Sequence, residues 1–388
     1  MSLTVAEVMP LEAFNTFRLI AGEAGLKRKI QMVGMLDYEL GDMIEQNFRE
    51  DEFVITTLVA IKDDLSQLET MVERLIKIKS SGFAIKTIYI SEVPQVVIDL
   101  CEREAYPLFL FDETFFEIII TSVNDVLKTQ DELEDLEIQI DRLLSGDMNK
   151  YGIRRAAQLL NRSFLENVQV AYVKNENRAS ANLAGVFTLN QVNQGNRQHK
   201  CIPYQSGYLV IISAPLSDAN LFTHPMNHIF SQLGIDSHYI QGFSQIGIKL
   251  DKLDVAIHEA LYACETAKRY QLPKLLFSEM GLDRLLLPVK DNPWVMAYYE
   301  AVMTPLLAYD QKNGTQLLRT SVIFILCGGD IKRAAERLYQ HGNTVRYRME
   351  RIRQLLCESR GEETQSEWSF YEMLAVGVRL HLIYTDDL

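Results

Sequence analysis

Residues 315–356 read TQLLRTSVIFILCGGDIKRAAERLYQHGNTVRYRMERIRQLL, and this stretch decides the fold of the C-terminal part of the chain. Its apolar spacing and turn residues predict three short helices, at 316–326, 331–338 and 345–356. Gly328-Gly329 is expected to end the first helix, because glycine readily adopts the backbone of a helix C-terminus. Asp330 is expected to cap the second helix, and Asn343 or Thr344 the third.

The third of these helices is amphipathic. Val345, Met349, Ile352 and Leu356 follow one another at spacings of 4, 3 and 4 residues, which places them on one inner face. The small pair Ala334-Ala335 lets the second helix cross a neighbour closely. A helix, a glycine-bearing turn, an alanine-rich helix, a second turn and a basic helix together predict a helix-turn-helix. One alternative is an antiparallel helical hairpin with a basic surface. Another is a protein-binding adaptor that uses its helical C-terminus for a partner rather than for DNA.

The predicted DNA-binding residues gather around the start of the third helix. The last helix of such a motif enters the major groove with its N-terminal end towards the base edges. Arginine can then pair with guanine, and we expect Arg346 to contact a base and Tyr347 a base or a phosphate. Arg348 lies between the faces and could form a structural ion pair instead. The predicted set is Lys332, Arg333, Gln340, His341, Asn343, Thr344, Arg346, Tyr347 and Arg351.

The charge of the chain is unevenly distributed. The net charge is −13, yet residues 319–360 contain nine basic and four acidic residues, so this segment carries +5 and the remainder −18. A basic segment on an acidic body suits a modular DNA-binding protein, because only one part of the chain attracts phosphates. A solvated helix face would give the same pattern.

Residues 1–120 alternate between strand-like and helix-like segments, which predicts an α/β domain with parallel strands. Strands are expected at 30–37, 53–58, 83–90 and 107–111, and helices at 65–79 and 94–105. Ligands of such domains bind beyond the C-terminal ends of the strands. The candidate effector-binding residues are therefore Asp37, Thr56, Thr57 and Ser91.

A long helix is predicted at 115–146, of which 121–147 is interpreted as a linking or dimerisation segment. Its apolar residues are spaced 7, 3, 4 and 3 apart, as in a coiled coil: Val126, Leu133, Leu136, Ile140 and Leu143. This seam predicts a homodimer. The alternative is a helix that packs on its own domain.

A second α/β domain is predicted at 148–287 and an all-helical DNA-binding domain at 294–388. Strands are expected at 168–173 and 208–213 and a helix at 251–270. The polar residues 190–199 are interpreted as an exposed loop and 288–293 as a linker.

The remaining composition argues against several other classes of protein. The five cysteines are scattered without a CxxC pair, which favours a reducing compartment. The sequence shows no pattern typical of a signal peptide or of a transmembrane segment. We therefore expect a cytoplasmic protein without metal or cofactor. His224 and His228 lie four residues apart, but Pro225 and the lack of a third ligand nearby make them surface histidines.

The same residues carry a family resemblance. Gly328-Gly329-Asp330, Ala334-Ala335 and Leu338, followed by 341–348 (HGNTVRYR), resemble the C-terminal helix-turn-helix of PucR/CdaR-type regulators. Gly342 stands where that family often has arginine, which removes one expected phosphate contact. Residues 4–7, 19–26 and 52–57 resemble the family's N-terminal domain. The resemblance implies a regulator of a catabolic or nutrient-response operon, with purine use as the name-giving case, and leaves open the effector and whether the protein activates or represses.

Residues 148–285 resemble the family's degenerate GGDEF-like domain, which raises the alternative of a nucleotide-binding or signalling protein with residual GGDEF-type activity. Such cyclases need acidic magnesium ligands on a glycine-rich hairpin. The corresponding hairpin, at 202–209, has one glycine and no acid. Gly328-Gly329-Asp330 is not that motif, because it opens a helix. We therefore expect a protein that is not an enzyme, with double-stranded DNA and a small-molecule effector as partners.

Overall fold

A computed structural model describes residues 3–175, 183–194, 198–360 and 366–385. The chain divides into two compact units. The first comprises 1–140 and 181–191, and the second 141–180 and 192–388.

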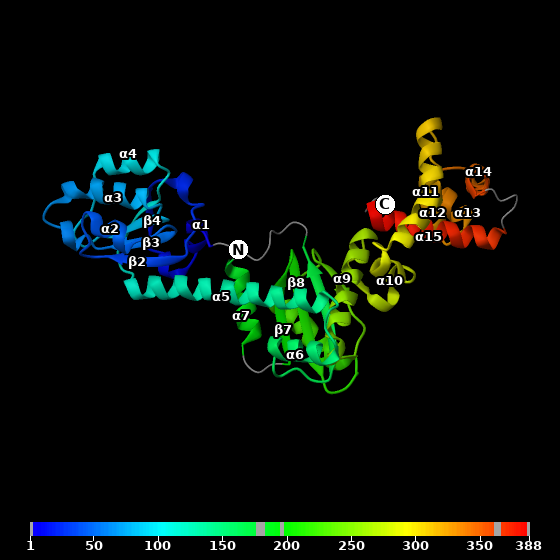
Figure 1. Ribbon diagram of the computed structural model, residues 1–388, viewed down its shortest axis with the longest axis horizontal. Helices are drawn as coiled ribbons and strands as arrows, with labels where there is room; N and C mark the ends of the chain where they lie inside the picture. The colour runs from blue at the N-terminus through cyan, green and yellow to red at the C-terminus, as the bar shows by residue number, and fades with distance from the viewer. Residues whose placement is uncertain (1–2, 176–182, 195–197, 361–365, 386–388) are drawn as a thin grey trace. The chain divides into compact units, whose positions relative to one another are not determined.

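The first unit is built on a five-stranded sheet in the order β1-β5-β4-β3-β2 (Figure 1). The strands are β1 (Arg18–Ala21), β2 (Met32–Leu36), β3 (Glu52–Thr56), β4 (Gly82–Lys86) and β5 (Leu108–Phe111). Strands β2 to β5 pair in parallel, as the sequence predicts, whereas β1 pairs antiparallel with β5. This edge strand was not predicted, because it is short and its first two residues, Arg18 and Leu19, are exposed.

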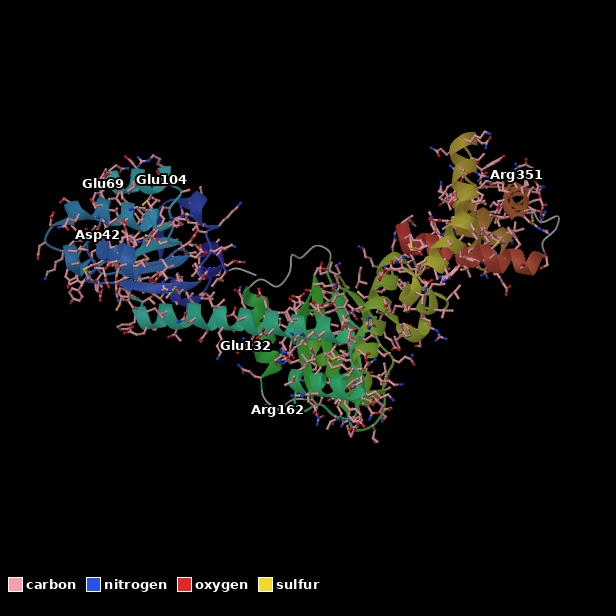
Figure 2. All side chains as sticks on the ribbon, viewed as in Figure 1. Asp42, Glu69, Glu104, Glu132, Arg162 and Arg351 are labelled. Carbon is pink, nitrogen blue, oxygen red and sulfur yellow. The ribbon has the colours of Figure 1, made fainter. Side chains whose placement is uncertain are left out.

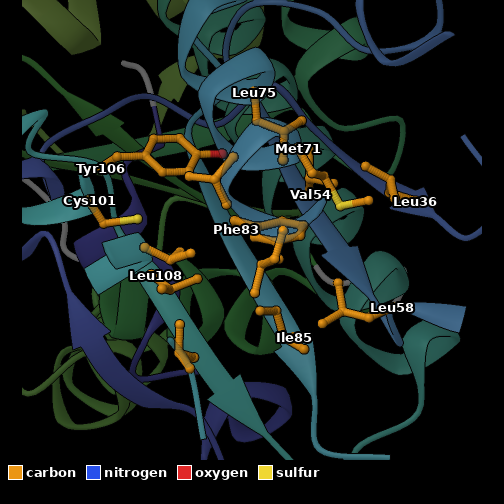
Figure 3. Close-up of a cluster of buried hydrophobic side chains, with 14 of the residues drawn as sticks. Leu36, Val54, Leu58, Met71, Leu75, Phe83, Ile85, Cys101, Tyr106 and Leu108 are labelled. Carbon is orange, nitrogen blue, oxygen red and sulfur yellow. The ribbon is translucent and has the colours of Figure 1, made fainter. Parts of the chain in front are cut away.

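Helices cover both faces of this sheet. They are α1 (Val5–Val8), α2 (Asp42–Asn47), α3 (Leu68–Lys77), α4 (Gln95–Arg103) and α5 (Phe116–Leu144), with 3₁₀ turns at Glu12–Phe14, Glu23–Gly25, Val59–Ile61 and Leu65–Gln67. Successive side chains of a strand point to opposite faces, so β3 contributes to two apolar cores. Val54 lies in the core formed with α3 and α4, and Phe53 lies in the core formed with α1 and α5. Figure 3 shows the first of these cores, where Val54, Phe83 and Tyr106 meet Met71 and Leu75.

The second unit contains a six-stranded sheet in the order β11-β9-β6-β8-β7, with β10 paired to β6. Its strands are β6 (Asn167–Lys174), β7 (His199–Tyr204), β8 (Gly207–Ala214), β9 (Ile240–Phe243), β10 (Ile248–Lys249) and β11 (Lys274–Leu276). The strands pair antiparallel, except for the parallel pair β9 and β11. Strands β7 and β8 form the predicted hairpin, with Gln205 in a left-handed backbone conformation at its turn.

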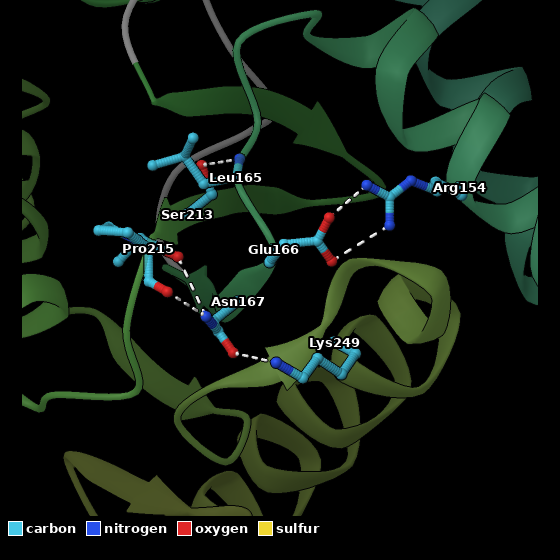
Figure 4. A network of polar contacts seen from close by, with 8 residues as sticks. Arg154, Leu165, Glu166, Asn167, Ser213, Pro215 and Lys249 are labelled. Carbon is cyan, nitrogen blue, oxygen red and sulfur yellow. Dashed lines mark hydrogen bonds and ion pairs between the residues drawn. The ribbon is translucent and has the colours of Figure 1, made fainter.

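The helices of this part are α6 (Lys150–Leu160), α8 (Asn220–Gln232), α9 (Leu253–Arg269) and α10 (Asp283–Leu286), with 3₁₀ turns at Leu250–Lys252, Phe277–Glu279 and Leu287–Val289. Helix α7 (Leu183–Asn193) belongs to the first unit up to residue 191. Helix α9 packs on the sheet, as its row of buried alanines requires. A polar network joins β6 to its surroundings, in which the Asn167 amide donates to Pro215 O at 2.8 Å and accepts from Lys249 Nζ at 3.0 Å (Figure 4).

The prediction of an exposed loop at 190–199 is wrong. This segment contains the end of α7 and the start of β7, and residues 195–197 lie outside the described part. The Asn193 side chain donates to the carbonyl of Cys201 and accepts from its amide, each at 2.8 Å. In the predicted linker at 288–293, residues 290–292 join a 3₁₀ turn to the next helix. The last residue of this segment, Pro293, opens that helix, and the Asn292 side chain caps it.

Five helices form the C-terminal part of the second unit. They are α11 (Pro293–Asn313), α12 (Leu317–Leu326), α13 (Ile331–Leu338), α14 (Gly342–Arg360) and α15 (Glu367–Thr385). They share one apolar core, to which α11, α13, α14 and α15 each contribute wholly buried side chains. The mixed α/β and helical organisation agrees with the sequence prediction. Among the described residues, no helix is long and apolar enough to cross a membrane.

Candidate nucleic-acid interface

The turn between α12 and α13 is fixed by glycine and aspartate. Gly328 and Gly329 have φ angles of 68° and 80°, in the left-handed region, and a Cβ atom on Gly329 would lie 2.8 Å from the ring of Tyr371. The Asp330 carboxylate then accepts from the amides of Lys332 at 2.8 Å and Arg333 at 3.1 Å. The predicted glycine turn and aspartate cap are both present, and the cap already occupies the amides at the start of α13.

The turn between α13 and α14 uses different residues. Ala334 and Ala335 are buried in the shared core, so α13 approaches its neighbours closely. Helix α13 is capped at its C-terminus by Tyr339, whose φ of 54° and ψ of 42° are left-handed. The amide of Gln340 returns to the carbonyl of Ala335 at 3.0 Å. A tyrosine thus occupies a backbone conformation that usually favours glycine.

Helix α14 begins earlier than predicted. Its cap is His341, whose Nδ1 accepts from the amide of Asn343 at 3.2 Å and whose carbonyl accepts from Thr344 at 2.9 Å. The prediction that Asn343 or Thr344 caps this helix is therefore wrong, and both residues lie in its first turn. The inner face is as predicted, because Val345, Met349, Ile352 and Leu356 are all buried.

Most residues of the predicted set point to solvent. Lys332, Arg333, Gln340, His341, Asn343, Arg346 and Tyr347 are exposed, and Thr344 is half-buried. The Arg346 guanidinium donates to Asn343 Oδ1 at 3.3 Å, so the two side chains that could read bases lie side by side. Arg333 Nε lies 3.7 Å from the Asp330 carboxylate. The first turn of α14 therefore presents a guanidinium, an amide and the phenol of Tyr347, whose side chain is 74% exposed.

Two arginines of α14 are held by the protein itself. Arg348 donates to Thr320 Oγ1 at 3.1 Å, which fits the structural role considered for it, although the partner is a hydroxyl rather than an acid. Arg351, labelled in Figure 2, lies over the ring of Tyr309 at 5.0 Å and donates to Gln354 at 3.2 Å. Contact with Tyr309, and then with Glu358, raises the pKa of Arg351 above its usual value. Of the predicted set, Arg351 is thus the member most engaged with other residues of this chain.

Comparison with known proteins agrees with this geometry. The Purine catabolism regulatory protein-like family matches residues 7–127, and the PucR C-terminal helix-turn-helix domain matches residues 317–359, which contain α12, α13 and most of α14. The two matched segments are thus similar to the N-terminal domain and to the C-terminal helix-turn-helix domain of the PucR family.

Two curated relatives from Bacillus subtilis (strain 168) are similar over part of the chain. The purine catabolism regulatory protein is 32% identical over 113 residues, which cover 29% of this chain and 20% of that protein. The proline-responsive transcriptional activator PutR is 28% identical over 108 residues, which cover 28% of this chain and 26% of that protein. A crystal structure of a regulator of polyketide synthase expression from Bifidobacterium adolescentis covers 63% of this chain and 98% of its own, at 17% identity and a TM-score of 0.26, a likeness too low to inform the fold.

The predicted effector residues of the PucR-type N-terminal domain are only partly brought together. Leu36 pairs with Thr56 in parallel register, so Asp37 and Thr57 follow the ends of adjacent strands. Ser91 is exposed and lies five residues beyond the end of β4.

Thr56 and Asp37, at the strand ends, differ in their hydrogen bonding. Thr56 is buried, and its hydroxyl accepts from the amide of Leu58 at 2.9 Å. Asp37 Oδ1 is buried without a hydrogen-bond partner among the described residues. Burial, and then the neighbouring charge of Glu39, raises the pKa of Asp37. A buried carboxylate oxygen at a strand end keeps this edge of the sheet as the candidate effector site.

Proposed function

We propose that the chain is a DNA-binding transcriptional regulator that does not act as an enzyme and whose helix α14 reads the major groove. The observation that carries this proposal is the exposed first turn of α14, with Arg346 hydrogen-bonded to Asn343, in a segment that matches the PucR helix-turn-helix. A guanidinium and an amide at the N-terminal end of a recognition helix suit guanine and adenine respectively.

The other members of the predicted set serve to position α14. Lys332, Arg333, Gln340 and His341 are exposed on α13 and on the turn, where contacts to phosphates usually originate. Asn343, Thr344 and Tyr347 flank Arg346 in the first two turns, and Arg351 reaches a phosphate from further along the helix. The Asp330 carboxylate already accepts from the amides of Lys332 and Arg333 at the start of α13. Phosphates near this end of the helix are therefore bound by side chains and not by these amides.

We assign residues 1–120 to a sensor domain, 121–147 to a linking and dimerisation helix, 148–287 to a degenerate GGDEF-like domain and 294–388 to the DNA-binding domain. The dimer is proposed because one helix-turn-helix contacts few bases and two copies give useful affinity. Leu133 and Leu136 in the middle of the α5 seam are half-buried, so part of their apolar surface is available there.

A small molecule bound at the end of β2 and β3 is proposed to control DNA binding. Asp37, Thr56 and Thr57 supply a carboxylate and two hydroxyls for it, with Ser91 on the neighbouring loop. The relatives are named for purine catabolism and for a response to proline, so a purine-derived or nitrogen-source compound is the class to test first. A thermal-shift comparison of uric acid, allantoin and proline, on the wild type and on Asp37→Asn, tests this assignment.

The proposal is tested by selecting duplexes from a random DNA library with the full chain. We expect enrichment of one sequence and binding that weakens steeply with salt, because Lys and Arg release counterions from phosphates. A protein-binding adaptor would enrich no sequence and show no salt dependence, which would contradict the proposal.

A further inference from the structure

Tyr339 caps the C-terminus of α13 in a left-handed backbone conformation. Its φ of 54° lies in the same region as those of other non-glycine residues that follow helices of this chain, namely Lys79, Ala105 and Gln271. Two hydrogen bonds hold it there, since its own amide reaches Glu336 O at 3.2 Å and the next amide, that of Gln340, reaches Ala335 O at 3.0 Å. In the turn before α13, the left-handed positions are occupied by glycines, Gly328 and Gly329. Glycine would serve the fold at position 339 equally well.

The side chain of Tyr339 is distinguished by its exposure to solvent. It is 95% exposed, more than any other large apolar or aromatic side chain in the described part of the chain. A ring this exposed gains little from packing, so the side chain of Tyr339 adds little to the stability of the isolated fold.

The position of Tyr339 indicates what it contacts. Tyr339 stands two residues before His341, the cap of α14. It therefore lies next to the N-terminal end of the helix that presents Asn343 and Arg346. Exposed neighbours on the same turn, Gln340 and His341, are polar. A phenol hydroxyl donates a hydrogen bond well to a phosphate oxygen, and such contacts fix the register of a recognition helix on the duplex.

We infer that the Tyr339 hydroxyl donates to a DNA backbone phosphate and thereby positions α14 in the groove. The left-handed backbone of Tyr339 aims the ring away from the protein core and towards the duplex. This inference rests on the proposed function, and it adds a DNA contact that the sequence pattern did not indicate.

The test compares Tyr339→Phe and Tyr339→Gly with wild type in the full chain, on the selected duplex and on a scrambled one. Tyr339→Phe should weaken binding to both duplexes roughly tenfold, as expected for one hydrogen bond to a charged acceptor, without changing the melting temperature. Tyr339→Gly should weaken binding at least as much while raising the melting temperature, because glycine relieves the backbone. This opposite movement of stability and affinity is not expected of a residue that serves the fold.

A control variant and two possible outcomes distinguish an error in the phosphate contact from an error in the proposed function. Tyr151, a tyrosine of α6 that is 86% exposed, should tolerate Tyr151→Phe without any effect on DNA binding. If Tyr339→Phe binds both duplexes as wild type does while Arg346→Ala loses specific binding, the phosphate contact is wrong and the proposed function stands. If the wild-type chain shows no salt-dependent binding, the proposed function fails and this inference fails with it.

Discussion

The guanidinium of Arg379 on α15 lies 3.3 Å from the carboxylate of Asp283 on α10, and the Asp283 side chain is wholly buried. The same guanidinium donates to the hydroxyl of Tyr270 at the end of α9, at 2.6 Å, and lies over its ring. Around this contact, Ala263 and Leu287 share one apolar cluster with Leu380. The last helix of the chain is therefore fixed to the helices that cover the six-stranded sheet.

The first prediction concerns this ion pair. Asp283→Asn leaves the Arg379 guanidinium without its charge partner and should lower the free energy of unfolding by about 3 kcal/mol. The measurement is urea denaturation of both single variants and of Asp283→Asn combined with Arg379→Met. Glu50→Gln breaks the exposed pair with Lys79, at 3.5 Å, and should cost nothing measurable. Additive effects of the two changes at 283 and 379 would show that the pair is not coupled.

The second prediction concerns thiol reactivity. Cys101, Cys201 and Cys264 are buried, and burial raises the pKa of each thiol to about 12. Because the thiolate is the reacting species, these three should resist a disulfide reagent in the native protein, while the half-buried Cys327 and Cys357 react. Titration before and after denaturation should count two accessible thiols and then five. Rapid native reaction of three or more thiols would contradict the burial.

The third prediction concerns Glu259, which is 7% exposed on α9 and accepts from the amide of Gln245 at 2.8 Å. Burial raises the pKa of Glu259 above the 4.5 of the unfolded chain. The folded state therefore holds this proton more tightly, and the carboxyl stabilises the fold at low pH but loses that contribution as pH rises above 4.5 through the raised pKa.

Glu259→Gln keeps a hydrogen-bond acceptor and removes the titration. Its free energy of unfolding should improve relative to wild type as the pH rises from 4.5 to 7.5, measured by denaturation at each pH. Glu73→Gln, at an exposed position on α3, is the control. A variant that loses stability relative to wild type as the pH rises would reverse the predicted sign.

The fourth prediction concerns the α5 seam. Leu133→Lys combined with Leu136→Lys places two charges on the proposed dimer surface and should reduce the mass measured by light scattering from dimer to monomer. Glu132→Gln, at an exposed position labelled in Figure 2, is the control and should leave the mass unchanged. A double variant that remains folded and dimeric would place the interface elsewhere.

The sequence predicted those features that depend on local pattern. The spacing of Val345, Met349, Ile352 and Leu356 gave the buried face of α14, and Asp330 capped α13 as its residue type suggests. The cap of α14 was misassigned, because preferences favour side-chain oxygens and the imidazole nitrogen of His341 takes that role here.

Other features depend on residues far apart in the chain. Arg379 and Asp283 are separated by 96 residues, and no period or motif connects them. Tyr309, whose ring lies beneath Arg351, is on α11. Arg351, which the sequence pattern places among the DNA-binding residues, is therefore partly held by the protein. Tyr339 was passed over because a left-handed backbone at a tyrosine has no signal in the sequence.

The central claim is that the first turn of α14 reads DNA, and titration of Arg346→Ala against the selected and the scrambled duplex at two salt concentrations tests it most directly. The account predicts a loss of about 1–3 kcal/mol on the selected duplex and little change on the scrambled one. Lys332→Ala, as the matched phosphate contact, should weaken both duplexes equally and reduce the salt slope by about one. If Arg346→Ala binds both duplexes as wild type does, α14 does not read DNA through this turn.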